Sequence, residues 1–209
     1  MSFIRAIMVG SAIALGLAAV SWGPSAAALE LVEPPFLQAR VTAGELPPVA
    51  ARVPDIPVVV TFDGERSPGA YGGDLRMLMA KQKDIRMMTV YGYARLIGYD
   101  MDLNLVSDIL ERVDIEQGRI FTLYLRKGHK WSDGEPFTTE DFRYYWEDVV
   151  NNETISPFGV PQVLLIDGEA PRVEFIDETT LRYSWSNPNP FFLPALAGAR
   201  PLYIYRPAH

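Results

Sequence analysis

Cysteine is absent from this chain of 209 residues, and histidine occurs only twice. Without thiols the chain cannot form disulfides, thiolate metal sites or a cysteine nucleophile. The two histidines, His129 and His209, lie far apart in the sequence, and neither has a second histidine at helical spacing. The glycine-rich residues 69–73 are not followed by the Lys-Ser/Thr pair of a phosphate-binding loop. We therefore expect neither a metal nor a cofactor.

Basic residues are outnumbered, with 19 lysines and arginines against 26 acidic residues and a net charge of −7. Because nucleic-acid binding needs clustered basic residues, this scattered minority argues against a nucleic-acid partner. The acidic pairs at residues 140–141 and 147–148 are neighbours on one predicted helix, whereas hydrolytic carboxylates face each other across a cleft. We identify no catalytic residue and expect a protein that is not an enzyme.

Residues 1–28 have the pattern of a secretory signal peptide. Their apolar run, residues 6–20, is shorter than the roughly 20 residues of a membrane span. Ala26 and Ala28 give the small-x-small pattern before a cleavage point ahead of Leu29. The alternative, an uncleaved anchor helix, lacks the basic cluster that stops transfer. We expect an exported, periplasmic protein.

The stretch after this leader has weak or conflicting patterns. Residues 29–57 are rich in proline, which predicts extended, weakly packed chain. We predict strands at residues 58–62 and 74–79. The middle of residues 87–98 favours a helix before a turn at Gly98, and residues 105–112 favour a weak amphipathic helical turn.

The pattern becomes clear at residues 119–126, where Phe121, Leu123 and Leu125 alternate with more polar positions. This period of two predicts a strand with one buried face. The Ser-Asp-Gly of residues 132–134 predicts a tight turn.

A capped helix should follow. Thr138 is a good N-cap, and Asp141 stands where a capping box places its acid. An apolar stripe at helical spacing predicts one buried helix face. Its members are Phe142, Tyr145, Trp146, Val149 and Val150. We expect the helix to end at residues 151–152.

The last part of the chain predicts four elements. Residues 172–176 and 181–185 alternate in polarity on either side of a polar connection of four residues, which predicts a β-hairpin. Residues 191–197 predict a short helix that stops at Gly198, and residues 201–205 predict a further strand.

The stretch from Leu125 to Asp141 resembles the sequence motif of the oligopeptide-type, family 5 solute-binding proteins of ABC importers. That motif runs Leu-Arg-Lys-Gly-x-Lys-Trp-x-Asp-Gly-x-Pro-Phe-Thr-x-Glu-Asp-Val. Residues 71–79 are similar to the opening strand of that family, and residues 175–198 to its hairpin and following helix. The matching positions of the motif are Leu125, Arg126, Lys127, Gly128, Lys130, Trp131, Asp133, Gly134, Pro136, Phe137, Thr138, Glu140 and Asp141.

The resemblance implies a fold and a function. The fold is an α/β, periplasmic-binding-protein-like (type II) architecture, incomplete here, with a mixed sheet and antiparallel hairpins. Residues 58–209 would be the N-terminal portion of the solute-binding domain, and the second lobe of the family would follow the point where this sequence ends. We interpret the chain as an N-terminal fragment. The implied protein is a monomeric receptor that closes on a peptide or other small solute and delivers it to an ABC permease.

The resemblance implies few site residues. Residues 156–158 resemble a segment in which an aromatic ring approaches bound peptide, which makes Phe158 a candidate ligand contact. The alternative is that Phe158 is an ordinary core residue. Lys83 is the second candidate, because residues 81–84 follow a predicted strand and binding sites gather at strand ends; otherwise it belongs to a solvated turn.

Three other conspicuous side chains have a structural explanation. We expect Trp131 and Trp146 to pack against each other's elements, and Asp133 to shape the tight turn. Two other functions stay open at this stage. One is an exported hydrolase whose catalytic residues lie outside this sequence, and the other is a truncated remnant that binds nothing.

Overall fold

The computed structural model describes residues 30–209 except 63, 65, 89–92 and 199. The predicted signal peptide, residues 1–28, lies outside the described residues. The fold given below is that of the unit Val32–His209. Within the described residues, no helix is long and apolar enough to cross a membrane.

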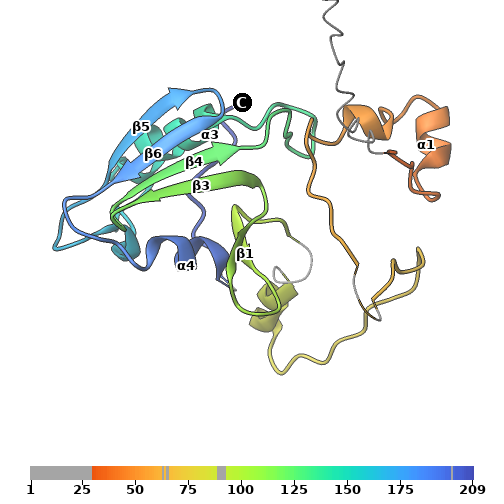
Figure 1. Cartoon of the computed structure of the whole chain (residues 1–209), viewed down its shortest axis with the longest axis horizontal. Helices are drawn as coiled ribbons and strands as arrows, with labels where there is room; N and C mark the ends of the chain where they lie inside the picture. Colours follow the sequence, from red (N-terminus) through yellow and green to blue (C-terminus); the bar gives the residue numbers. More distant parts are fainter. Residues whose placement is uncertain (1–29, 63, 65, 89–92, 199) are drawn as a thin grey trace, which may run out of the picture. The chain divides into compact units, whose positions relative to one another are not determined.

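A four-stranded antiparallel sheet with the order β3-β4-β6-β5 forms the centre of this unit (Figure 1). The strands are β3 (Leu110–Glu116), β4 (Ile120–Leu125), β5 (Arg172–Asp177) and β6 (Thr180–Ser184). The expected mixed sheet is purely antiparallel in the described part. The turns β3–β4 and β5–β6 are too short for the crossover that a parallel pair needs, so each joins antiparallel neighbours.

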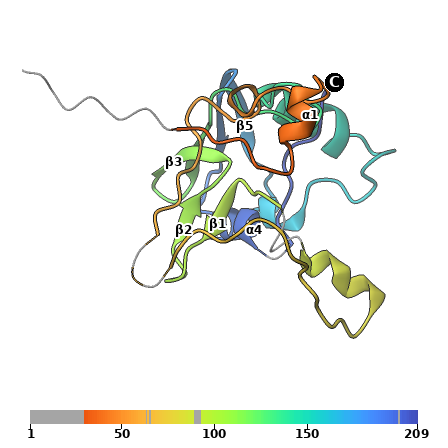
Figure 2. The ribbon, with the colours of Figure 1, turned by 90° about the vertical axis from the view of Figure 1, so that its right-hand side faces the viewer.

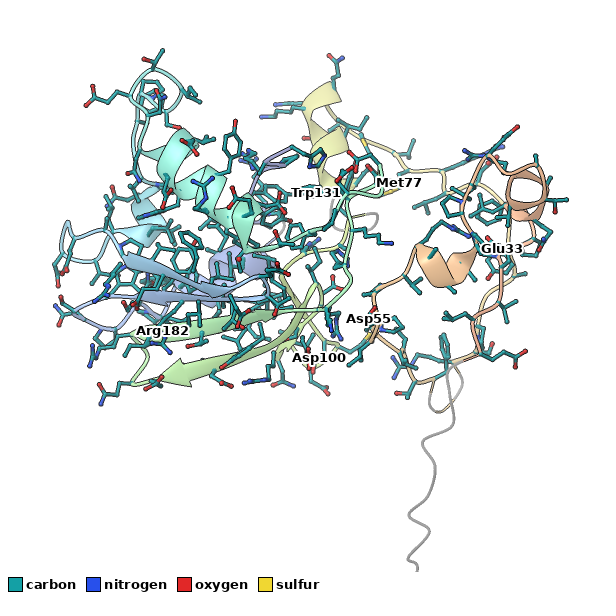
Figure 3. All side chains as sticks on the ribbon, turned by 90° about the horizontal axis from the view of Figure 1, so that it is seen from above. Glu33, Asp55, Met77, Asp100, Trp131 and Arg182 are labelled. Carbon is teal, nitrogen blue, oxygen red and sulfur yellow. The ribbon has the colours of Figure 1, made fainter. Side chains whose placement is uncertain are left out.

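One face of the sheet is apolar and carries the core. The inward side chains of β4 and β6 include Leu123 and Tyr183, both fully buried. The helix α4 (Phe192–Ala197) covers this face through Phe192, whose ring centroid lies 5.1 Å from those of Phe121 and Tyr183. The opposite face is polar, and there Arg182 donates to the Thr122 hydroxyl at 3.2 Å (Figure 3).

A second helical segment covers the same apolar face. It begins as α3 (Thr139–Tyr144) and continues as the π-helix η3 (Tyr145–Val150). Phe142 is fully buried, and the Trp146 ring lies 6.3 Å from that of Tyr183 on β6. The predicted stripe therefore faces the core, with Trp146 and Val149 partly buried.

Several predicted local signals are confirmed. Thr138 and Asp141 form both bonds of the capping box. The turn at residues 132–134 closes with the Gly134 N–H donating to the Trp131 carbonyl at 3.0 Å. The β5–β6 hairpin and α4 lie where predicted, although the hairpin connection is two residues long because β5 extends to Asp177 and β6 begins at Thr180.

Two predicted strands before the core are wrong. Residues 58–62 and 74–79 form neither strand nor helix, and every one of these residues is exposed. Both runs are apolar, but neither pairs with a strand in the described part, and an unpaired run has no ladder to stabilise it. Residues 201–205 are also not a strand, although Ile204 and Tyr205 are buried.

Residues 105–112 are strands instead of the expected helical turn. They contribute β2 (Leu105–Ser107) and the start of β3, and β2 pairs with β1 (Ile97–Tyr99) in a separate hairpin. Gly98 lies within β1, so the predicted turn there is wrong. This hairpin lies beside α4 (Figure 2), where the Arg95 guanidinium donates to the Ala197 carbonyl at 2.9 Å.

The proline-rich residues 29–57 are less extended than predicted. They contain α1 (Gln38–Thr42) and the 3-10 turn η1 (Val49–Ala51). Two more 3-10 elements are η2 (Gln82–Met88), which occupies part of the expected helix at residues 87–98, and η4 (Gln162–Leu164). The middle of that expected helix, residues 89–92, lies outside the described residues.

Candidate functional site

The loop after η3 carries the first candidate residue. Asn151 ends η3, and its side-chain amide donates to the Trp146 carbonyl at 2.5 Å. Phe158 lies further along this loop with 98 % of its surface exposed. The alternative that Phe158 is an ordinary core residue is therefore wrong. Its role as a ligand contact stays a prediction.

Hydrogen bonds within the loop fix its backbone. The Asn152 side-chain oxygen accepts from the Thr154 N–H at 3.0 Å, and the Asn152 carbonyl accepts from the Ser156 N–H at 2.7 Å. Gly159 has a φ of 65°, and its N–H donates to the Ser156 carbonyl at 2.8 Å. Because an L side chain rarely adopts this φ, glycine permits the turn that directs Phe158 outward.

An open hollow of about 570 Å³ lies at this loop. Of the described residues that line it, Glu153 is the only charged one, and none is lysine, arginine or histidine. An exposed ring next to a carboxylate suits a neutral or positively charged solute, whereas it repels an anion. The lining residues are Val150, Asn151, Glu153, Ser156, Pro157, Phe158, Gly159 and Val160.

The second candidate residue, Lys83, lies elsewhere. It is exposed within η2 and does not line the hollow at Phe158. The Asp84 carboxylate accepts from the Lys81 N–H at 3.0 Å and so fixes the start of η2. The structure does not bring Lys83 and Phe158 into one cavity, and the role of Lys83 stays a prediction.

The residues that we interpreted as structural have structural contacts. The Trp131 ring packs against Phe137 at 5.2 Å, and the Asp133 carboxylate accepts from the Glu135 N–H at 3.1 Å. Trp146 packs on Tyr183 of β6, and both tryptophans lie partly buried against the same core, so their packing against each other's elements stays a prediction. The pKa of Asp133 is held below its ordinary value, chiefly by a hydrogen bond with His209.

A second hollow of about 570 Å³ lies between the turn that links β4 to α3 and the β5–β6 turn, and sequence reasoning missed it. His129 lines it and has a buried Nδ1 without a hydrogen-bond partner in the described part of the chain. Burial lowers the pKa of His129, which keeps its ring neutral at physiological pH. No sequence signal distinguishes this histidine, because its burial depends on Phe137, which packs edge-on at 5.5 Å.

A third hollow, of about 420 Å³, was also missed and lies between β1 and the end of α4. Two exposed tyrosines, Tyr93 and Tyr99, line it together with Arg95 and Asp108. The Arg95 N–H donates to the Asp108 carboxylate at 3.0 Å, so these two residues tie the segment before β1 to the one before β3. Among the described residues, no cluster of histidine and acidic residues could hold a metal ion.

Comparison with known proteins gives consistent matches. Residues 104–206 match the family model for bacterial extracellular solute-binding proteins, family 5 Middle. The chain is similar to the periplasmic alpha-galactoside-binding protein of Rhizobium meliloti, with 30% identity over 186 residues, which cover 77% of this chain and 26% of that protein. It is 33% identical over 115 residues to the periplasmic oligopeptide-binding protein OppA of Escherichia coli, covering 48% of this chain and 21% of that protein.

Solved structures agree with these matches. A structure of an oligopeptide-binding protein OppA superposes on 83% of this chain with a TM-score of 0.69 and 30% identity, and 27% of that protein is covered. The periplasmic binding protein MelB, solved with stachyose, has a TM-score of 0.54 at 24% identity, which supports the fold alone. The α/β periplasmic-binding-protein fold expected from the sequence is thereby confirmed. The chain spans about a quarter of the length of the curated relatives that it matches.

Proposed function

Through residues 104–206 the chain belongs to family 5 of the bacterial extracellular solute-binding proteins, and we propose that it binds a small solute for an ABC importer. In this proposal the protein captures its solute in the periplasm and delivers it to a membrane permease. The family is one of binding proteins, and the solute is carried without chemical change. The names of the curated relatives, which describe periplasmic binding proteins, support this location.

Two kinds of solute are candidates. A peptide is favoured by the similarity to oligopeptide-binding proteins. An α-galactoside is favoured by a specific observation, namely that the galactoside-binding relative aligns with 77% of this chain, a larger share than the 48% of the oligopeptide-binding relative. Within the described part of the chain, Glu153 is the only charged residue that lines the hollow at Phe158, so we expect a neutral sugar or a peptide with neutral or basic side chains.

The observation that carries this proposal is the exposure of Phe158 in the matched segment. A ring with 98 % of its surface in water gains free energy when a solute covers it, and a rigid loop adds little ordering cost to that contact. The ring face suits either a peptide plane or the apolar face of a sugar ring.

The division of the chain made from its sequence is part of the same proposal. Residues 1–28 are the leader, residues 29–57 an N-terminal segment and residues 58–209 part of a solute-binding domain. Lys83 is kept as a second ligand contact. For the whole protein, we propose a monomer with two lobes that close on the solute, a mechanism for which this chain supplies part of the first lobe.

The test is calorimetric titration of the chain with trialanine, trilysine, triglutamate and stachyose, repeated on Phe158→Ala. At least one neutral or cationic solute should bind, and Phe158→Ala should weaken that binding by about 5- to 30-fold, because it removes a ring contact of about 1–2 kcal/mol. Triglutamate should be the weakest of the peptides.

The matched control is Ile155→Ala, which removes an exposed apolar side chain of the same loop that does not line the hollow. It should leave the affinity unchanged. If none of the four solutes binds, this chain alone is not a receptor for these solute classes. If the solutes bind to Phe158→Ala as well as they bind to the unmodified chain, the binding site lies elsewhere.

A further inference from the structure

We infer that residues 33–56, which we call the arm, form a latch that docks on the turn between β4 and α3. The docking groups are Arg126 and Lys130, two basic positions of the sequence motif that solute binding leaves unexplained. This inference concerns how the N-terminal part of the chain is held, and it does not depend on the proposed solute.

The arm is folded on itself. The Glu33 carboxylate accepts from the Val49 N–H at 3.0 Å and forms an ion pair with Arg52. The Arg52 guanidinium also donates to the Pro47 carbonyl at 2.8 Å. These bonds close the segment containing α1 into a loop, so the arm can dock and undock as one unit. Figure 3 shows Glu33 within this loop and Asp55 near its far end.

Three hydrogen bonds join the arm to the turn. The Asp55 N–H donates to the Lys127 carbonyl at 3.0 Å. The Arg126 guanidinium donates to the Ile56 carbonyl at 3.1 Å, and the Lys130 ammonium donates to the Ala51 carbonyl at 2.6 Å.

Arg126 is also anchored to the body of the domain, because its Nε donates to the Asp108 carbonyl at 2.8 Å. The guanidinium thus links the arm to the segment before β3. Bonds from charged donors are stronger than those between neutral groups, so these two basic side chains dominate the docking.

Gly128 allows Asp55 of the arm to lie close to the backbone of the turn. Its φ of 75° lies in the left-handed region, and a Cβ there would stand 2.6 Å from the Asp55 carboxylate. It would also stand 3.2 Å from the Asp55 nitrogen, which is backbone and cannot turn away. A side chain at Gly128 would therefore push the arm off the turn.

The attachment is polar and can open by itself. Every residue from 33 to 56 is described, and none is buried. No described residue between 57 and 81 belongs to a helix or strand, so release of the arm breaks no other element. Segments held by few contacts and without core burial open far more often than the domain unfolds.

Hydrogen exchange of the full chain, followed by mass spectrometry, tests the latch. The double variant Arg126→Gln/Lys130→Met should increase exchange of the Asp55 amide, the arm amide that donates to the turn, by about tenfold or more, because it removes two charged donors. The control is Lys127→Met, since the Lys127 side chain makes no hydrogen bond or ion pair in the described part, and it should leave the arm protected. Exchange in β4 and β6 should be unchanged in both.

A second variant addresses the possibility that the double variant disturbs the core. Gly128→Ala places a Cβ against Asp55 and changes no buried residue, so it should increase exchange of the Asp55 amide while β4 keeps its protection. If β4 loses protection in the double variant, Gly128→Ala decides. An Asp55 amide that exchanges like a free peptide in the unmodified chain, or that stays protected in Gly128→Ala, overturns the inference.

Discussion

At the scale of single residues, the burial or exposure of a side chain limits how far its role can be predicted from the sequence. The resemblance of residues 156–158 to a family segment made Phe158 a candidate, but its exposure follows from the loop bonds of Asn152 and the turn at Gly159, which no periodicity encodes. We set His129 aside for lack of a metal partner, whereas its feature of interest is a half-buried ring whose buried Nδ1 has no hydrogen-bond partner in the described part of the chain. This burial arises from the packing of Phe137 on the ring, which no periodicity or spacing in the sequence indicates.

His129 predicts a pH dependence of stability. Its pKa in the folded chain is below the ordinary value of 6.5, chiefly because burial disfavours the charged ring. As the pH falls through 6.5, the unfolded chain takes up a proton that the folded chain still refuses, so the free energy of unfolding falls. Above pH 6.5 the His129 ring is neutral in both the folded and the unfolded chain, so it does not change the free energy of unfolding with pH.

Urea unfolding of His129→Gln between pH 5 and 7 measures this contribution. The variant should show a smaller loss of stability on acidification than the unmodified chain. His209→Gln, which alters the other histidine, serves as the control and should keep the slope that His129 provides. Equal slopes in the His129→Gln variant and the unmodified chain would contradict the assignment.

At the scale of helices and strands, a strong local sequence pattern was enough to predict an element where a partner element pairs with it. The alternation of β4 is confirmed because β3 and β6 pair with it on both sides. The apolar runs at residues 58–62 and 74–79 have similar composition but no partner strand in the described part. Residues 105–112 became strands for the converse reason, since β1 and β4 supply partners for a pattern that is ambiguous by itself. In these segments, hydrogen bonding to a partner strand determined whether a strand formed, and intrinsic strand propensity did not.

The α3 cap gives a prediction at this scale. The Asp141 carboxylate accepts from the Thr138 N–H at 2.9 Å and from the Ala208 N–H at 3.1 Å, and it is 3% exposed. Thr138→Ala should lower the free energy of unfolding by about 1 kcal/mol, because it removes one cap bond. Asp141→Ala should cost more, about 2–3 kcal/mol, because it leaves two donors without a partner.

Chemical denaturation at pH 7 compares the two variants. Glu140→Ala is the matched control, since its carboxylate is on the same first turn but is exposed and pairs with Arg143 at the surface. It should change stability by less than about 0.5 kcal/mol. Equal effects of Glu140→Ala and Asp141→Ala would refute the special role of the buried acid.

At the scale of the whole molecule, the proposed signal peptide at residues 1–28 predicts export. In a bacterial host, the full chain should appear in the periplasmic fraction with Leu29 as its first residue, because the proposed cleavage would remove residues 1–28. Ala26→Arg/Ala28→Arg should block this cleavage. Mass spectrometry of the fractionated protein provides the readout, and an intact Met1 on periplasmic protein would contradict the predicted cleavage.

The position of the first core residue has a consequence for synthesis. Among the described residues, none before Leu96 is buried, whereas Phe137 and Phe142 pack on Tyr205 near the other end of the chain. A ribosome must therefore make the chain through Tyr205 before this aromatic cluster can close. Until then the preceding segment lacks these packing contacts and stays threadable, which is the state that a secretion channel accepts.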